Sequence, residues 1–199
     1  MEKFGKSQPV TRREDQRFLT GAGRYVDDIA PDEALQVYFL RSPMAHAVIS
    51  DLDVSDAAQM DGVHLIVTAD DLVAAGVNVH MDTSLVTNID GSKGADPKRP
   101  MLAQGRVRFV GEAIAMIVAD TMEQAKDAGE AIMVDFDELG VHVTPVWGGA
   151  AIHPEAPDNK VFDWGMGDKD ATDAAFDAAD QTVSLSIDDN RIIVNSMEP

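Results

Sequence analysis

The chain has 199 residues, no cysteine and a formal net charge of −19 at pH 7. This length suffices for one domain with a buried core, or for one domain and part of another. Without thiols, these residues offer no disulfide, thiolate nucleophile or cysteine metal site. The acidity disfavours nucleic acid and anionic lipid as partners, because both are bound through cationic surfaces.

No membrane span is expected, because the longest apolar run is far shorter than the roughly 20 residues that a spanning helix needs. The first residues carry charges without an apolar stretch after them, so a cleaved signal peptide is not expected either. We therefore expect a cytoplasmic protein.

The first third of the chain predicts a short helix over residues 13–19, ended by Gly21, and then strands over 35–41 and 45–54. The Gly21-Ala22-Gly23 run does not indicate a nucleotide loop, because no strand precedes it and a third glycine is missing. Asp51 and Asp53 share one strand face. Two carboxylates without a third ligand are more typical of a solvated face than of a metal site.

The next segment predicts a helical turn that Ser55 begins and Gly62 ends, a buried strand over 64–68, and a helix over 69–75. Thr68 and Asp71 have capping-box spacing at the start of that helix. Residues 88–100 indicate a loop that carries three cations, Lys93, Lys98 and Arg99. The cations suit docking of a partner, although an exposed mobile loop is the favoured interpretation.

The best-marked stretch is 106–144, which predicts strand, turn, strand, helix and strand. Gly111 suits a tight turn with a left-handed backbone, and the apolar run 113–119 predicts a strand buried on both faces. Thr121 and Gln124 have capping-box spacing at the start of the helix, and a strand follows from Met133.

Beyond Thr144, prolines and glycines indicate a linker. A capped helix is expected over 171–179, with Ala174, Ala175 and Ala178 as its packing face. Strands are then expected over 182–187 and 191–194, joined by a hairpin turn at Asn190.

Sequence patterns identify no catalytic, cofactor-binding or metal-binding residue. Asp168, Asp170 and Asp173 resemble the start of a calcium loop, but Asp173 stands where that loop needs glycine, and Ala179 where it needs glutamate. No serine elbow or phosphate-binding loop is present. The histidines have no pair at helical metal-site spacing; they are His46, His64, His80, His142 and His153.

Four ordered stretches resemble the start of the large subunit of the molybdenum hydroxylases, the family of xanthine dehydrogenases, aldehyde oxidases and aerobic carbon monoxide dehydrogenases. The central one is VRFVGEAIAMIVADTMEQAKDAGEAIMVDFDELGVHVTPV, which is similar to the α/β hammerhead segment of that subunit. The others are RREDQRFLTGAGRYVDD, RSPMAHA, and DWGMGDKDATDAAFDAADQTV followed by NRIIVNSMEP. The last pair looks most like the carbon monoxide dehydrogenase branch.

The resemblance implies an α+β fold: a hammerhead with a mixed sheet and short capped helices, and the beginning of a molybdopterin-binding domain. The expected divisions are an N-terminal arm (1–20), the hammerhead (21–145), a linker (146–162) and a truncated cofactor domain (163–199).

The implied parent enzyme hydroxylates a substrate carbon with oxygen from water, or oxidises carbon monoxide, at a molybdenum centre. Its expected cofactor is molybdopterin cytosine dinucleotide, with iron–sulfur clusters and FAD on partner subunits, and no cofactor is expected in this fragment. The expected partners are the remainder of the large subunit and the iron–sulfur and flavin subunits. The family's catalytic glutamate belongs to a different motif, so its role is not assigned to Glu112. His46, within RSPMAHA, is expected to have a fixed structural partner.

Two hypotheses follow. The chain is an architectural fragment of such a subunit, inactive alone, or it is a free-standing hammerhead that acts as a binding or assembly module.

Overall fold

The computed structural model describes residues 12–81, 85–190 and 192. Contacts between Cα atoms divide the chain into two compact units. One unit is Leu35–Asp180, and the other combines the segments on either side of it, as far as they are described. All strands of the described residues belong to the first unit, which also carries the candidate site.

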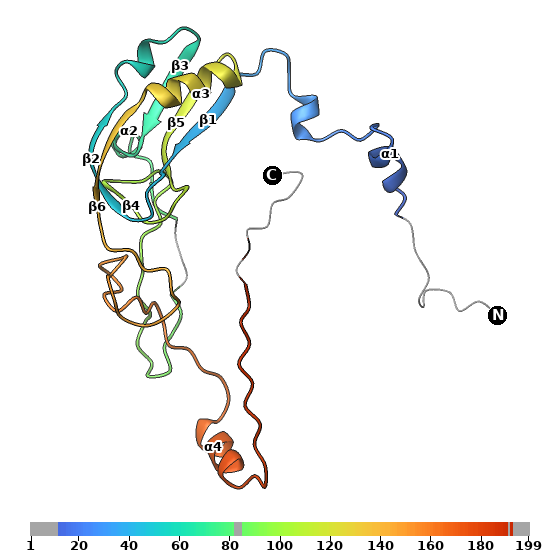
Figure 1. Ribbon diagram of the computed structural model, residues 1–199, viewed down its shortest axis with the longest axis vertical. Helices are drawn as coiled ribbons and strands as arrows, with labels where there is room; N and C mark the ends of the chain where they lie inside the picture. The colour runs from blue at the N-terminus through green and yellow to red at the C-terminus, as the bar shows by residue number, and fades with distance from the viewer. Residues whose placement is uncertain (1–11, 82–84, 191, 193–199) are drawn as a thin grey trace, which may run out of the picture. The chain divides into compact units, whose positions relative to one another are not determined.

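Short strands alternate with short helices along the chain, and Figure 1 labels the strands and the α-helices. They are α1 (Asp15–Leu19), η1 (Val26–Ile29), β1 (Gln36–Arg41), β2 (Ala47–Asp53), η2 (Ala57–Gln59), β3 (Val63–Thr68), α2 (Ala69–Ala74), β4 (Arg106–Val107), β5 (Ala113–Ala119), α3 (Met122–Ala131), β6 (Met133–Glu138) and α4 (Lys169–Asp177).

The strands form two three-stranded sheets, with strand orders β1-β5-β3 and β4-β2-β6. Every pairing is antiparallel. In the first sheet Ile117 lies between Tyr38 and Ile66, and in the second Ile49 lies opposite Phe136. The strands of the described residues therefore form two antiparallel sheets, where a mixed sheet was expected. The five-residue link between β1 and β2 carries the chain from one sheet to the other.

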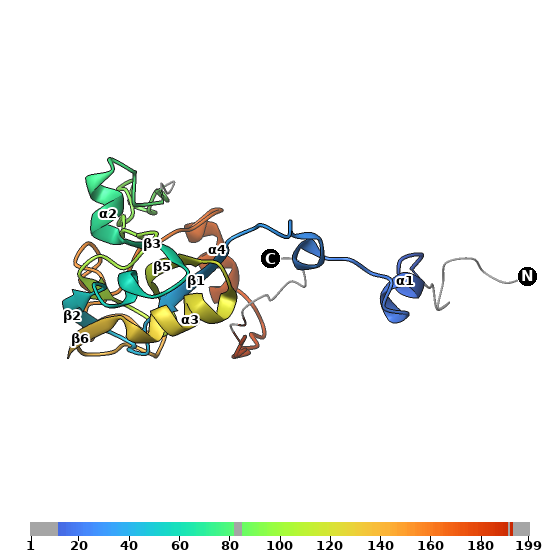
Figure 2. The ribbon, with the colours of Figure 1, turned by 90° about the horizontal axis from the view of Figure 1, so that it is seen from above.

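Helix α3 begins at the predicted capping box and covers one face of the β1-β5-β3 sheet (Figure 2). Thr121 accepts from the backbone N–H of Gln124 at 3.2 Å, and Gln124 Oε1 accepts from the N–H of Thr121 at 3.1 Å. The helix buries small residues, Ala125, Ala128 and Gly129, so its backbone approaches the sheet closely. A Cβ at Gly129 would lie 2.7 Å from the ring of Tyr38.

The main core lies between α3 and this sheet, where Ile117, Ala115 and Ala119 of β5 are fully buried. Tyr38, Leu40 and Ile66 of the flanking strands pack against the same cluster. A second, smaller core joins the two sheets; it consists of Ala47, Ala103, Val107 and Ile114.

The sheet face opposite α3 is also apolar, but it is only partly covered. Because successive side chains of a strand point to opposite faces, the neighbours of the main-core residues lie on this side, in two rows across the three strands. Val37, Phe39 and Leu65 are 43%, 37% and 50% exposed. We call this surface the open sheet face; its six residues are Val37, Phe39, Leu65, Val67, Met116 and Val118.

Two local expectations before α2 need correction. The 64–68 strand is not buried throughout, because the side chains of His64 and Leu65 are exposed. Ser55 does not cap η2: the N-cap is Asp56, and the backbone N–H of Ser55 instead donates to Asp53 Oδ1 at 2.8 Å. The turn Asp53-Val54-Ser55 thus closes on the preceding carboxylate.

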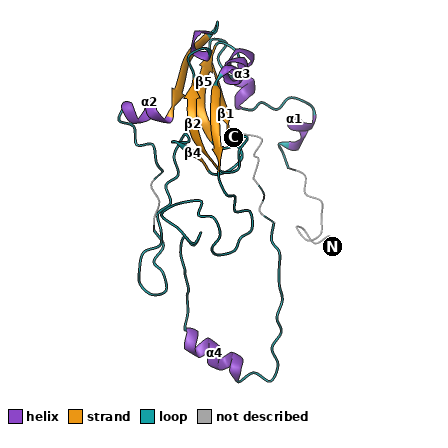
Figure 3. Ribbon diagram, turned by 60° about the vertical axis from the view of Figure 1, so that its left-hand side comes forward, coloured by secondary structure: helices purple, strands orange, loops and turns teal. Residues whose placement is uncertain are grey.

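Two expectations beyond residue 162 are also wrong. Helix α4 forms, with Asp168 Oδ1 accepting from the N–H of Ala171 at 2.9 Å, but it buries no residue, so its alanines pack against nothing described. Residues 182–187 form no strand, because no described segment supplies the hydrogen bonds that a strand needs. Figure 3 draws this stretch as loop. The expected strand at 191–194 falls largely outside the described residues.

Candidate functional site

The turn between β4 and β5 is closed by the carboxylate of Glu112, which is 7% exposed. Glu112 Oε2 accepts from the backbone N–H of Arg108 at 2.5 Å. Gly111, at φ +91°, donates its N–H to the carbonyl of Ser42 at 2.8 Å. Arg41 Nη1 donates to the carbonyl of Gly111 at 2.9 Å. The bond from Arg108 gives the buried carboxylate a partner, and the bonds of Gly111 connect the turn to Ser42 and Arg41.

A short antiparallel ladder brings Arg99 to the same place. The N–H of Met81 donates to the carbonyl of Arg99 at 3.2 Å, and the N–H of Met101 donates to the carbonyl of Val79 at 2.8 Å. His80 and Pro100 pair between them. Because Val79 is buried, the ladder is anchored to the body of the unit.

A third segment brings in His153. Asn159, whose backbone is in the left-handed region at φ 55°, holds this segment together through its side chain. Its Nδ2 donates to the carbonyls of Gly148 and Ala150, both at 2.9 Å, and its Oδ1 accepts from the N–H of Ile152 at 3.1 Å. Asparagine tolerates this conformation better than most residues, and here its side chain ties the loop that carries His153.

These three segments surround a cavity of about 410 Å³, which we call the arginine cavity. Its lining combines four cationic side chains with one carboxylate, one imidazole and several apolar groups. The lining residues are Arg41, Met81, Lys98, Arg99, Pro100, Met101, Arg108, Phe109, Gly111, Glu112, Ala113 and His153.

The structure separates the three cations that the sequence groups in one loop. Lys93 donates to Thr87 Oγ1 at 2.8 Å, away from the cavity, whereas Lys98 and Arg99 line it. Lys98 pairs with Asp96 at 2.5 Å, so its charge is partly balanced within the loop. The loop assignment for 88–100 is confirmed, and docking of a partner there remains a prediction.

Two buried nitrogens that belong to cavity residues have no hydrogen-bond partner within the described part of the chain: Arg108 Nε and His153 Nδ1. Most buried polar atoms in proteins are hydrogen-bonded, and leaving one unsatisfied costs about 1–3 kcal/mol. Burial lowers the pKa of His153, with the positive charge of Arg108 acting in the same direction. The imidazole is therefore neutral near pH 7.

We expect His153 to make folding less stable in acid. Its pKa is lower in the folded chain than in the unfolded chain, so the unfolded chain binds the extra proton first. Stability should fall as the pH drops below about 6.5 towards the folded-state pKa. Urea unfolding from about pH 7.5 to about pH 5 measures this, with His153→Gln flattening the profile. An unchanged profile in that variant would contradict the assignment.

His46 is 4% exposed and has the fixed structural partner that its motif suggested. Its Nδ1 lies 2.7 Å from the carbonyl of Gly140, and since a carbonyl only accepts, Nδ1 carries the proton. Its Nε2 is buried without a partner among the described residues. His46 also acts electrostatically on His153, so the fold brings near each other two histidines that lie far apart in the sequence.

The other candidate residues are not gathered into a site. His64 pairs with Asp120 at 2.7 Å on the surface, and His142 Nε2 lies 2.9 Å from the carbonyl of Val146. Asp168 caps α4, and Asp173 pairs with Lys169. Within residues 12–81, 85–190 and 192, no group of three or more His, Cys, Asp or Glu side chains is placed to hold a metal ion.

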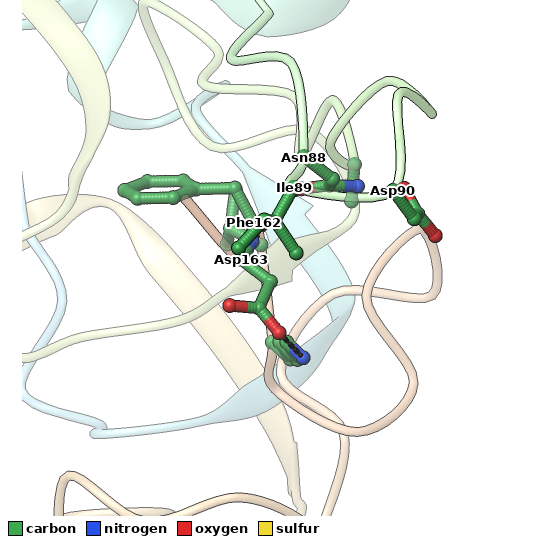
Figure 4. Close-up of a pocket in the computed structure, with 8 residues that line it drawn as sticks. Asn88, Ile89, Asp90, Phe162 and Asp163 are labelled. Carbon is green, nitrogen blue, oxygen red and sulfur yellow. Dashed lines mark hydrogen bonds and ion pairs between the residues drawn. The ribbon is translucent and has the colours of Figure 1, made fainter. Parts of the chain in front are cut away.

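A second hollow lies where the loop 88–95 meets the segment 160–163. Figure 4 shows residues of the two segments around it. Its volume is about 290 Å³. The N–H of Ile89 donates to the carbonyl of Asp163 at 2.8 Å, and the N–H of Asp163 donates to Asn88 Oδ1 at 2.8 Å. Lys160 pairs with Asp163 at 2.7 Å. Since its polar groups already bond one another, this hollow ties the segment 160–163 to the loop 88–95.

Sequence reasoning missed the arginine cavity. It considered Arg99, Glu112 and His153 for separate reasons, and it did not consider Arg41 or Arg108. The available signal was the pair of basic residues around Val107 in GRVRFVGE, beside a turn glycine. Nothing in the sequence placed His153 near them, because about 40 residues separate it from that turn.

No helix in the described residues has the length and apolar character required to cross a membrane.

The family model for the aldehyde oxidase and xanthine dehydrogenase a/b hammerhead domain matches residues 20–140. The nicotine 6-hydroxylase large subunit of Paenarthrobacter nicotinovorans is 35% identical over an aligned length of 195 residues. The match covers 95% of this chain and 23% of that protein. The carbon monoxide dehydrogenase large chain of Hydrogenophaga pseudoflava is 35% identical over an aligned length of 191 residues. That match covers 86% of this chain and 22% of the other.

Among solved structures, the Cu,Mo-CO dehydrogenase in its carbon monoxide reduced state is similar in fold, with a TM-score of 0.62 and 32% identity. The match covers 86% of this chain and 22% of that one. The chain thus spans less than a quarter of the length of the relatives that it matches. With its antiparallel sheets and a family match over residues 20–140, the chain belongs to the molybdenum hydroxylase family of aldehyde oxidases and xanthine dehydrogenases, and it contains that family's a/b hammerhead domain.

Proposed function

We propose that this chain is an architectural part of the large subunit of a carbon monoxide dehydrogenase-like molybdenum enzyme, and that its open sheet face packs against the remainder of that subunit. The parent would oxidise a small substrate with oxygen derived from water. The observation that carries this proposal is the open sheet face itself.

The open sheet face has the character of an interface that a partner covers. Its two rows alternate regularly with the side chains buried under α3, so both faces of a three-stranded sheet are apolar. Sheets that face water on one side usually carry polar residues there. Phe39 and Leu65 are 37% and 50% exposed, and covering them would release further apolar surface from water.

Two further stretches support the same proposal. Helix α4 exposes Phe176 by 62%, although its sequence alternates small and polar residues as a packed helix does. In the other unit, Val183, Leu185 and Ile187 are 92%, 80% and 76% exposed at every second position. This alternation is typical of a strand whose neighbours come from elsewhere.

The molybdenum centre is proposed to lie in the remainder of the subunit, with molybdopterin cytosine dinucleotide as its cofactor and iron–sulfur and flavin groups on partner subunits. The arginine cavity does not fit a metal ion, because four of its five charged side chains are cationic and the positive charge of Arg108 acts on its imidazole. We therefore derive no catalytic step from the residues of this chain, and we assign none of them to the cofactor. A cytoplasmic location stays a prediction.

The test is a charge placed on the open sheet face of the complete enzyme. Leu65→Glu should lower the yield of assembled, molybdenum-containing enzyme by about tenfold or more, since an unpaired buried carboxylate costs several kcal/mol. Val73→Glu is the matched control, because Val73 on α2 is 48% exposed and lies outside the open sheet face. Molybdenum content and substrate turnover of the purified enzyme provide the readout.

Equal yields and activities for the two variants would show that the open sheet face is not an interface, and the proposal would be wrong. The alternative, a free-standing hammerhead that acts as a binding or assembly module, makes a different prediction for the gene. A stop codon directly after Pro199 favours the module, whereas several hundred further codons favour the large subunit.

A further inference from the structure

We propose that the arginine cavity binds a small organic anion, with a carboxylate or phosphate group held by the arginines and an apolar body against Phe109 and Met101. This site is independent of the proposed function, because it rests on the cavity alone.

The charge of the cavity is opposite to that of the protein. The chain has a formal net charge of −19, with 16 lysines and arginines in all, yet four of them line this one cavity. The only carboxylate in the lining is Glu112, and one of its oxygens already accepts from the backbone N–H of Arg108. Cations gathered in a partly enclosed space repel one another, and an anion removes that repulsion.

The arginines retain donors for such an anion. Arg41 uses Nη1 for the carbonyl of Gly111, which leaves its other guanidinium donors available. The Nε of Arg108 is buried and has no partner in the described residues. The guanidinium of Arg99 makes no ion pair with a carboxylate of the described chain. A guanidinium presents its N–H groups as a planar fork that matches the oxygens of carboxylate and phosphate.

The remaining walls indicate what the anion is attached to. Phe109 and Met101 line the cavity and are 58% and 56% exposed, so their apolar surface is open to a ligand. A volume of about 410 Å³ lies in the usual range for small-molecule sites, about 300–1,000 Å³. It holds an aromatic or branched aliphatic group together with its anionic head.

The fold keeps these groups in position without a ligand. Arg108 follows β4 directly, in the turn that Glu112 and Gly111 close. Arg99 is carried by the ladder with residues 79–81, which is anchored at buried Val79. Because backbone hydrogen bonds already hold the segments that carry the arginines, binding of the anion requires the ordering of side chains alone.

Binding of four probes to the full 199-residue chain, measured by titration calorimetry at low ionic strength, tests the proposal. Benzoate and phenyl phosphate carry the anion on a ring, whereas acetate and inorganic phosphate are the anions alone. We expect saturable binding of benzoate, phenyl phosphate or both, about tenfold tighter than the matching bare anion, because the ring buries apolar surface. Binding of only one ring probe identifies the carboxylate or the phosphate as the preferred head group.

Variants then locate the site. Arg99→Gln should weaken binding about tenfold, the effect of losing a hydrogen bond to a charged group. Arg108→Lys, which retains the charge but removes the Nε donor, should weaken binding as well. Lys126→Gln on α3 is the matched control: it removes the same charge from an exposed position outside the cavity and should leave the affinity unchanged.

The proposal is overturned if neither ring probe binds saturably. It is overturned equally if Arg99→Gln and Lys126→Gln weaken binding by the same factor, since that result indicates non-specific attraction. Arg99 is exposed, so its variant tests the site even if Arg108→Lys fails to fold.

Discussion

Replacing Ile117 by alanine should lower the free energy of unfolding by about 2–5 kcal/mol, the usual cost of a large-to-small change in a packed core. Ile117 is fully buried at the centre of β5, between Tyr38 and Ile66 on the neighbouring strands. Its Cδ1 comes within 3.8 Å of the position that a Cβ on Gly129 would occupy. The helix and the sheet therefore meet at this side chain, and its loss leaves a cavity that neither can readily fill.

The matched control is Leu65→Ala on the opposite face of the same sheet. Leu65 is 50% exposed, so its truncation in the 199-residue chain should cost less than about 1 kcal/mol. Urea unfolding, followed by circular dichroism, measures both variants. Equal losses would contradict the division into a covered face and an open sheet face.

Replacing Gly111 by valine should lower the free energy of unfolding by more than about 1 kcal/mol. The backbone of Gly111 has φ +91°, where a β-branched residue is strained. The space around it is open, since a Cβ there would meet nothing within 4 Å. The loss of stability therefore comes from backbone strain. The strain would affect the turn in which the N–H of Gly111 donates to Ser42 and its carbonyl accepts from Arg41.

Gly111→Asn separates backbone strain from general sensitivity at this position. Asparagine adopts positive φ more readily than valine, so the asparagine variant should lose clearly less free energy of unfolding, measured in thermal or urea unfolding. An unchanged melting temperature for the valine variant, or equal losses for valine and asparagine, would argue against the strained turn. The valine variant should also weaken binding in the arginine cavity, because Arg41 is held by the carbonyl of Gly111.

Local chemistry explains why most elements could be predicted. The capping boxes at Thr68 and Thr121 start α2 and α3 where expected, because a cap is decided within four residues. Gly21 and Gly111 both have positive φ, as their positions after a helix and within a turn indicated. The apolar run 113–119 became the central strand β5, buried along most of its length.

Apart from the cap at Ser55, the errors concern what lies beside an element. His64 and Leu65 have strand propensity whether or not a layer covers them, so propensity does not reveal the open sheet face. The alanines of α4 have the spacing of a packing face, but nothing described packs on them. Residues 182–187 alternate as a strand does, yet a strand needs a neighbour for its backbone hydrogen bonds, and none is described.

The sequence by itself determined the family, most of the caps and turns, and the strands of the hammerhead, because each depends on residues that are close together in the chain. Only the tertiary structure decided that the strands form two antiparallel sheets, one of them with an uncovered apolar face. It alone brought Arg41, Arg99, Arg108 and His153 around one cavity. Those side chains come from segments up to about 110 residues apart, and only the folded backbone hydrogen bonds between them place their charges together.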